Sequence, residues 1–209
     1  MSSDSLILAL PKGRVFESFK PLLDGTNFQL KIEKDRSRKI LIDTKSKSLK
    51  ILLIRGWDIP TYVNAGAAHL GVVGKDILLE KSSEEFIELL DLKIARCRLC
   101  LAGKRHILET SGKMRIATKY PTVSIEFMKS LGIQAEIFYL HGSQEVAPML
   151  GLSDGIVDLV DSGKTLNDNG LKEIKVIKNI SARLISNKAA LKTKGNLITE
   201  LKETLLSKI

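Results

Sequence analysis

The chain has 209 residues, 44% of them hydrophobic and 27% charged, which excludes wholesale disorder, and its two cysteines cannot frame a disulfide-stapled domain. No apolar run approaches the roughly 20 residues that a membrane span needs, and the apolar stretch near the amino terminus is too short for a signal peptide. The net charge of +9 favours anionic partners, yet the basic residues are spread along the chain in no long block. We therefore expect a cytoplasmic globular protein that binds phosphorylated small molecules, with no nucleic-acid or membrane partner.

In the first half of the chain, short apolar runs bounded by turn residues predict strands. In chain order these strands are Ser5–Leu10, Lys39–Thr44, Leu49–Arg55 and Leu70–Val73. The second and third are separated by a polar turn and are expected to pair. An amphipathic helix is predicted from about Val15, and another from Pro60 to about Ala65 with Asp58 as its N-cap.

The second half continues the alternation of strands and helices. Its predicted strands are Ala95–Leu101, Met114–Thr118, Gln134–Leu140, Ile156–Val160 and one or two more within Ile174–Asn187. A helix is expected to begin at Pro121, a short one to be capped by Ser143, and a last one to span Asn196–Ile209. Strands that alternate with helices imply an α/β fold with a parallel or mixed sheet.

The most informative local pattern lies between Gly151 and Leu171. The apolar strand Ile156–Val160 runs into the sequence DSGKT (residues 161–165), where a helix begins. Small residues between a strand end and a helix start present backbone N–H groups to a phosphate. A Walker A loop would need a glycine five positions before Gly163, where this chain has Asp158. Taken alone, the loop could also be an ordinary strand-to-helix turn with a capping serine.

This loop resembles the diphosphoribosyl-binding loop of phosphoribosyltransferases. In such loops small residues hold the 5′-phosphate, and acids face the ribose hydroxyls or their Mg²⁺. Asp158 matches the second acid of that pattern, whereas Val157 occupies the position of the first.

Five further blocks accompany the loop in a fixed order. They are LPKGR (10–14), RGWDIPTYVNAGAAHLGVVGKDILLE (55–80), CRLCLAG (97–103), RIATKYP (115–121) and HGSQEVAP (141–148). Together the six blocks resemble the ATP phosphoribosyltransferase family, in the short form that lacks a carboxyl-terminal regulatory domain. The resemblance implies two α/β lobes like those of a type II periplasmic binding protein, with the active site in the interlobe cleft. It places residues 1–95 and 182–209 in the first lobe and 96–181 in the second.

The resemblance also implies a reaction. The phosphoribosyl group of phosphoribosyl pyrophosphate would pass to N1 of ATP, giving phosphoribosyl-ATP and pyrophosphate in the first step of histidine biosynthesis. Because the adenine nitrogen is itself the nucleophile, such a glycosyltransferase needs no catalytic serine, cysteine or histidine. Catalysis would come from holding two polyanions in line and stabilising the leaving pyrophosphate, to which Mg²⁺ would be bound.

Site residues follow from the matched blocks. Binding of the phosphoribosyl group is assigned to Asp158, Asp161, Ser162, Gly163, Lys164, Thr165 and Glu145. Binding of ATP or pyrophosphate is assigned to Lys12, Arg14, Arg55, Arg96, Arg98 and Arg115, of which Arg14 and Arg55 are the candidate catalytic residues. The last three arginines could instead form ion pairs between the lobes.

Partners are implied in the same way. Short-form members work with a regulatory subunit that resembles histidyl-tRNA synthetase, so we expect a homodimer of this chain within a hetero-oligomer. No protein metal site is expected, because Cys97 and Cys100 face opposite sides of a strand and have no further ligands. The chain departs from the family pattern at His69, Gln144 and Gly155, and His69 is expected to be structural.

Two other readings remain open from the sequence. A pure binding protein of the same two-lobe architecture would trap an anion without chemistry, although such proteins are mostly secreted. A nucleic-acid binder would explain the positive charge, but the chain shows no helix-turn-helix, OB or RRM pattern and no aromatic stacking platform.

Overall fold

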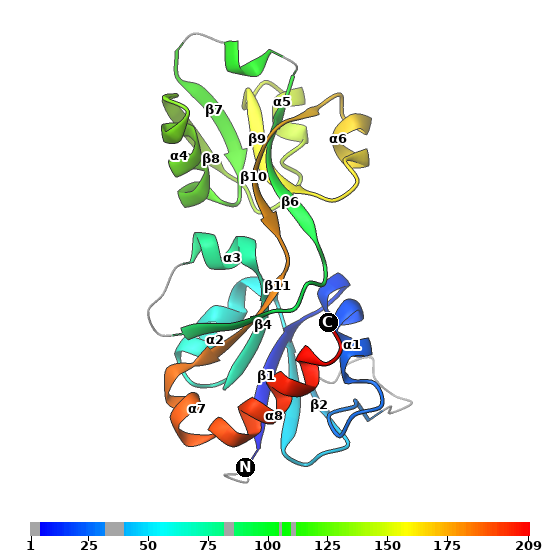
Figure 1. The fold of residues 1–209 in the computed structure, drawn as a ribbon. Helices are drawn as coiled ribbons and strands as arrows, with labels where there is room; N and C mark the ends of the chain where they lie inside the picture. The colour runs from blue at the N-terminus through cyan, green and yellow to red at the C-terminus, as the bar shows by residue number, and fades with distance from the viewer. Residues whose placement is uncertain (1–4, 32–39, 82–85, 105, 110–111) are drawn as a thin grey trace. The chain divides into compact units, whose positions relative to one another are not determined.

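The computed structural model describes residues 5–31, 40–81, 86–104, 106–109 and 112–209 (Figure 1). The chain divides into two compact units. Unit 1 comprises Met1–Ala95 and Ser181–Ile209, and unit 2 comprises Arg96–Ile180. The family resemblance implies a return to the first unit at residue 182, and in the structure unit 1 resumes at Ser181. Lys93 and Ala95 have positive φ angles of 53° and 50° where the chain leaves unit 1.

Unit 1 is built on a mixed six-stranded sheet with the order β2-β3-β1-β4-β11-β5. Its strands are β1 (Leu6–Pro11), β2 (Leu41–Asp43), β3 (Leu49–Ile54), β4 (Leu70–Gly74), β5 (Phe86–Asp91) and β11 (Ala182–Asn187). β1 lies at the centre and runs parallel to both β3 and β4, while β2, β11 and β5 pair antiparallel. The predicted α/β class and the predicted pairing of the second and third strands are confirmed.

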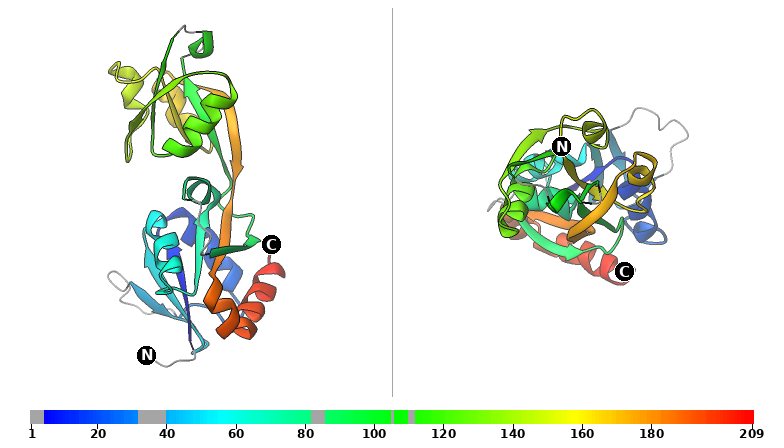
Figure 2. Two further views of the ribbon diagram at one scale, coloured as in Figure 1. Left: turned by 90° about the vertical axis from the view of Figure 1, so that its left-hand side faces the viewer. Right: turned by 90° about the horizontal axis from the view of Figure 1, so that it is seen from above.

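Helices cover both faces of the unit 1 sheet (Figures 1 and 2). One face packs against α1 (Arg14–Leu23), α7 (Lys188–Thr193) and α8 (Gly195–Leu206), and the other against α2 (Ile59–Asn64) and α3 (Lys75–Glu80). Along β1, Leu6, Leu8 and Leu10 join the first core, and Ala9 joins the second. A strand buried on both faces is apolar at nearly every position, which explains the continuous LILAL run.

Unit 2 contains a five-stranded sheet with the order β10-β6-β9-β7-β8. Its strands are β6 (Cys97–Gly103), β7 (Met114–Thr118), β8 (Ala135–Tyr139), β9 (Gly155–Val160) and β10 (Lys172–Ile180). β9, β7 and β8 run parallel, and β6 pairs antiparallel with both β9 and β10. The helix α4 (Pro121–Ser130) contacts β7 and β8. The short helices α5 (Val146–Met149) and α6 (Lys164–Asp168) share a core with Cys100, Ile156 and Val160.

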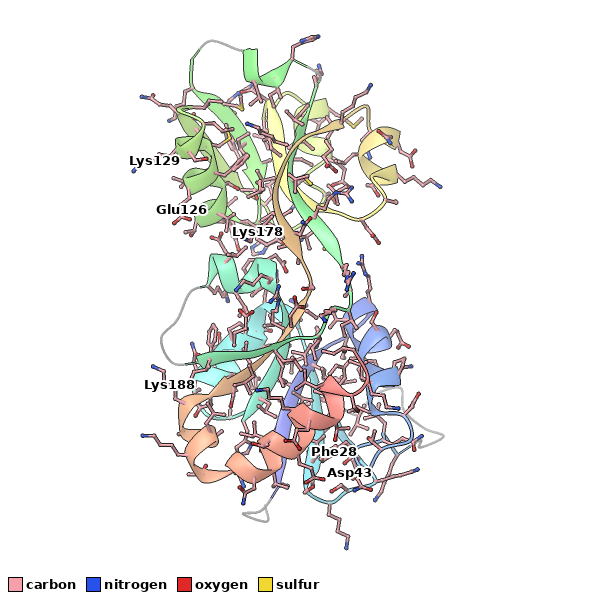
Figure 3. The ribbon with its side chains drawn as sticks, in the orientation of Figure 1. Phe28, Asp43, Glu126, Lys129, Lys178 and Lys188 are labelled. Atoms are coloured by element: carbon pink, nitrogen blue, oxygen red, sulfur yellow. The ribbon has the colours of Figure 1, made fainter. Side chains whose placement is uncertain are left out.

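The edge strand β10 carries a row of lysines whose arrangement has a structural explanation. Lys172, Lys175 and Lys178 lie opposite Gly103, Leu101 and Leu99, so two bulges bring all three to one face of the sheet. Figure 3 labels Lys178 on this strand. Bulges and exposed charges prevent an edge strand from pairing with another chain. These three lysines therefore protect a sheet edge.

Several local expectations need correction. α1 begins at Arg14 rather than Val15, so this arginine is the first residue of a helix. Ser143 does not cap α5, because the residue at the N-cap position is Glu145 and no side chain makes a capping hydrogen bond. Asp58 does hold the N-cap position of α2, but its carboxylate makes no capping bond either. The start of the predicted strand at Lys39 lies outside the described residues.

Candidate active site

A pocket of about 340 Å³ lies at the carboxyl end of β9 in unit 2. It is lined by residues from three places, namely the end of β9, the following loop into α6, and the segment that precedes α5. All seven residues assigned to the phosphoribosyl group line it: Glu145, Asp158, Asp161, Ser162, Gly163, Lys164 and Thr165. The structure thus brings Glu145 to a loop from which it is distant in sequence.

The loop after β9 is shaped by Gly163. This residue has φ of +77° and occupies the N-cap position of α6. The first intrahelical bond runs from the Asn167 N–H to the Gly163 carbonyl at 3.1 Å, so the preceding N–H groups have no partner within the helix. The Lys164 N–H makes only a long contact of 3.4 Å with Ser162 Oγ. Because α6 has five residues, these backbone donors matter more for anion binding than a helix dipole does.

The pocket lining also contains three carboxylates. Asp158 projects from β9, and its Oδ1 accepts a hydrogen bond from the Leu159 N–H at 2.8 Å. The same oxygen lies 3.2 Å from Nζ of Lys119, a residue that directly follows β7. Asp161 and Glu145 supply two further carboxylates. A pocket lined by both backbone N–H donors and carboxylates can bind a group that carries both a phosphate and hydroxyls.

The segment that supplies Glu145 is fixed by its neighbours. Gln144 is buried, with 2% of its surface exposed, and its side chain donates to the Leu140 carbonyl at 3.3 Å. Ser143 has φ of +52°, which turns the chain sharply before α5. The departure from the family pattern at Gln144 therefore adds a buried hydrogen bond next to the pocket.

In unit 1, the cations predicted to bind ATP or pyrophosphate gather at one edge of the sheet. Pro11, the last residue of β1, pairs with Ile54, the last residue of β3. Lys12 and Arg55 follow these two residues directly, and Arg14 begins α1 after Gly13, whose φ is +84°. The carboxyl ends of adjacent parallel strands are the usual place for a ligand in an α/β sheet.

Lys75 belongs to the same edge but is absent from the sequence-based assignment. It follows β4, the other parallel neighbour of β1, and its ammonium lies 2.6 Å from Glu88. The sequence signal that could have identified this position is the GKD string at residues 74–76, near the end of the second block. Its ion pair gives it a structural role within unit 1.

The other three arginines predicted to bind anions, Arg96, Arg98 and Arg115, belong to unit 2. Arg115 forms two hydrogen bonds with the Asp154 carboxylate, at 2.7 and 3.3 Å, and a third with the Gly151 carbonyl. It lies near the start of β7, at the opposite end of the sheet from the 161–165 loop, so the structure does not bring it to the pocket. Arg98 pairs with Glu173 at 3.0 Å. Both ion pairs lie within unit 2, so neither is one of the pairs between the lobes that the sequence left open as an alternative, and Arg96 is the first residue of this unit.

Hydrogen bonds from Arg115 lower the pKa of Asp154 below its ordinary value of 3.8, despite the opposing effect of burial.

His69 lies in unit 1 and is bound to the backbone of β1. Its Nδ1 accepts a hydrogen bond from the Ile7 N–H at 2.9 Å. Burial and the nearby Lys194 lower the pKa of His69 from 6.5, so the ring is neutral at pH 7. This bond to the backbone of β1 agrees with the expected structural role.

The cysteines carry no sign of metal or redox chemistry in the described residues. Burial raises the pKa of the Cys100 thiol to about 12, with Glu173 adding to the effect, so the thiolate that such chemistry requires is disfavoured. Among the residues that the structure describes, no three His, Cys, Asp or Glu side chains are grouped so as to hold a metal ion. None of the helices described is long and apolar enough to cross a membrane.

Comparison with solved structures defines the class of protein. The chain has the fold of the alkanesulfonate-binding protein SsuA from Xanthomonas axonopodis pv. citri, with a TM-score of 0.57 and 13% identity over 98% of this chain and 73% of that one. The extracellular-binding protein ytmK from Bacillus subtilis gives a TM-score of 0.59 and 12% identity over 98% and 93%. This is a two-lobed α/β protein with the type II periplasmic binding protein fold.

Sequence relatives and a more similar solved structure identify the family. A family model described as HisG: ATP phosphoribosyltransferase matches residues 55–207. The ATP phosphoribosyltransferase of Methylococcus capsulatus is 46% identical over 94% of this chain and 92% of its own length, and that of Ectopseudomonas mendocina is 44% identical over 96% and 95%. The ATP phosphoribosyl transferase (HisG:HisZ) complex from Thermotoga maritima matches with a TM-score of 0.82 and 34% identity over 97% of both chains. The chain belongs to the ATP phosphoribosyltransferase family, whose enzymes transfer a phosphoribosyl group to ATP in the first step of histidine biosynthesis.

Proposed function

We propose that the pocket at the carboxyl end of β9 binds the phosphoribosyl moiety of phosphoribosyl pyrophosphate. The observation that carries this proposal is the gathering of Glu145, Asp158 and residues 161–165 around one pocket. Backbone N–H groups near Gly163 would bind the 5′-phosphate, and Asp158 and Glu145 would accept hydrogen bonds from the ribose hydroxyls. Thr165 and Lys164 would add a hydroxyl donor and a positive charge to the phosphate side.

The cations of unit 1 would bind the remaining phosphates. Lys12, Arg14 and Arg55 supply positive charge at the carboxyl edge of the β1–β3 pair, where a triphosphate or pyrophosphate could be bound. As N1 of ATP attacks C1 of the ribose, the C1–oxygen bond breaks and its electron pair leaves with the pyrophosphate. Arginines that meet this growing negative charge lower the barrier, because they interact more strongly with the transition state than with the substrate.

Mg²⁺ is proposed as the cofactor and would arrive with the substrate. It prefers oxygen ligands and commonly uses one or two carboxylates together with substrate phosphates. Asp158, Asp161 and Glu145 offer such oxygens around the pocket. When bound, the ion would neutralise charge on the pyrophosphate, while Lys12, Arg14 and Arg55 orient that group.

We also propose that a second protein similar to the HisZ component of the Thermotoga maritima complex binds this chain. The support is the likeness of the two catalytic folds over 97% of both chains. The assembly would be a hetero-oligomer in the cytoplasm, with this chain paired as a homodimer and with the response to histidine carried by the partner.

An absorbance assay for phosphoribosyl-ATP tests the proposal. The purified chain is incubated with ATP, phosphoribosyl pyrophosphate and Mg²⁺, with and without the HisZ-like subunit, and histidine is titrated into each mixture. We expect product only when both substrates and Mg²⁺ are present, a higher rate with the partner, and inhibition by histidine only in its presence. Full activity and full histidine inhibition in the chain alone would contradict the proposed partner.

A further inference from the structure

Lys119 forms an ion pair at the edge of the phosphoribosyl pocket and has no role in the assignments above. Its Nζ lies 3.2 Å from Oδ1 of Asp158, and both side chains are mostly buried, with 23% and 21% of their surfaces exposed. The two residues come from neighbouring parallel strands, since Thr118 at the end of β7 pairs with Val157 on β9. The pair therefore lies at the carboxyl edge of the sheet, beside the pocket that Asp158 lines.

The backbone on either side of Lys119 is rigidly placed. Thr118 Oγ1 donates to the Val157 carbonyl at 2.7 Å and accepts the Tyr120 N–H at 2.9 Å. Thr118 and Tyr120 are both fully buried. The Lys119 ammonium also lies 5.1 Å from the centre of the Tyr120 ring, within range of a cation–π interaction. Anchoring both neighbours fixes the backbone of Lys119, so only its side chain has to be ordered when it binds a carboxylate.

We infer that Lys119 is a positioning residue, which orients the Asp158 carboxylate toward the ribose of the substrate. The Leu159 N–H and Lys119 both contact Oδ1, and Oδ2 takes part in neither contact. Because two donors hold Oδ1, Oδ2 can accept a hydrogen bond from a ribose hydroxyl without a change of the Asp158 rotamer. The inference rests on the proposed function and assigns Lys119 an action through Asp158.

Lys113 provides a matched control at the other end of the same strand. It precedes β7 at its opposite end and pairs with Glu136 at 3.6 Å, with both side chains about half exposed. A methionine at either position removes the charge and keeps an unbranched apolar stem. At position 119 that stem can still cover the Tyr120 ring, so the fold is preserved.

The test measures kcat and KM for both substrates, together with melting temperature, in the complex with the HisZ-like subunit. We expect Lys119→Met to raise KM for phosphoribosyl pyrophosphate about tenfold, because an Asp158 carboxylate that is no longer oriented loses its charge-assisted hydrogen bond to the ribose. The kcat value and KM for ATP should stay within about twofold, because an interaction made equally in ground and transition states affects binding alone. Lys119→Arg should restore most of the affinity, and Lys113→Met should match the wild type.

A double-mutant cycle with Asp158→Asn decides whether Lys119 acts through that carboxylate. If it does, Lys119→Met adds little to the loss already caused by Asp158→Asn. Effects that multiply would overturn the inference, since Lys119 would then contact the substrate itself, and an unchanged KM in Lys119→Met would overturn it as well. A wild-type complex that forms no phosphoribosyl-ATP would contradict the proposed function, a result distinct from either of these.

Discussion

The two units present their candidate binding residues in different ways. In unit 2, six of the seven residues lie within the eight positions from Asp158 to Thr165, and a single strand-to-helix connection places them around the pocket. In unit 1, the three cations come from two connections that are brought together by the pairing of β1 with β3. The first arrangement is a local motif with specific backbone geometry, while the second is an accumulation of charge that depends on sheet topology. We therefore expect unit 2 to determine substrate affinity and unit 1 to contribute more to the rate.

The largest effect is expected from Arg55→Ala. If Arg55 stabilises the leaving pyrophosphate, kcat and kcat/KM should fall together by about 100-fold or more. Steady-state kinetics with both substrates checks this. Lys50→Ala is the control, because Lys50 lies on the same strand and makes only an exposed 3.7 Å pair with Asp43. A raised KM with unchanged kcat would show that Arg55 only binds, and the division of labour between the units would be wrong.

A smaller effect is expected from Gly163→Ala. The left-handed φ of +77° disfavours any side chain, so the loop should relax and its N–H groups should move away from the phosphate. KM for phosphoribosyl pyrophosphate should rise about tenfold, as for the loss of a charge-assisted hydrogen bond. Gly170, with φ of +69° and open space around it, provides the control. Gly170→Ala should lose similar stability, about 1 kcal/mol, with no change in KM. Equal KM values in the two variants would remove the loop from the site.

The Arg115–Asp154 pair should affect the stability of unit 2 without affecting its pocket. Because the folded pKa of Asp154 is lowered, the pair contributes stability above the ordinary value of 3.8 and loses that contribution as the pH falls below it. Asp154→Asn should cost about 1 kcal/mol at pH 7, since both side chains are partly exposed. It should also weaken the acid dependence of unfolding between pH 5 and 3. Denaturant titrations test this, and a change in KM for phosphoribosyl pyrophosphate would be unexpected.

The smallest effect is expected on the stability of unit 1, where His69 titrates at a higher pH than Asp154 does. Its folded pKa lies below 6.5, so the unfolded chain takes up a proton first as the solution is acidified. Stability should therefore decline as the pH falls from 6.5, by less than about 1 kcal/mol for one partly buried group. His69→Gln keeps an acceptor for the Ile7 N–H and should flatten this dependence. Melting temperatures measured from pH 7.5 to 5 test this, and an unchanged slope would contradict it.

Elements with a strong local pattern could be predicted from the sequence, and those that depend on distant partners could not. The strand Ile156–Val160 is apolar and ends in small residues, and β9 spans Gly155–Val160 in the structure. In contrast, β5 (Phe86–Asp91) has no strict alternation and was not predicted. It is a strand because it pairs with β11, about 95 residues later in the chain. The helices α3 and α7 were also missed: six residues carry little periodicity, and neither helix has a proline in its first turn, as the equally short α2 has.

For the candidate site, the amino-acid sequence alone determined the residue types of the loop, the acids near it and the family. These depend on residue types at fixed spacings, which are properties of the chain itself. Only the tertiary structure decided which charged side chains form ion pairs. Arg115 is bound to Asp154 at the end of the sheet opposite the pocket, and Arg98 is bound to Glu173. Lys119 is bound to Asp158 beside the pocket. The physical reason is that an ion pair forms between side chains that strand pairing brings within about 4 Å, and no spacing along one sequence encodes that distance.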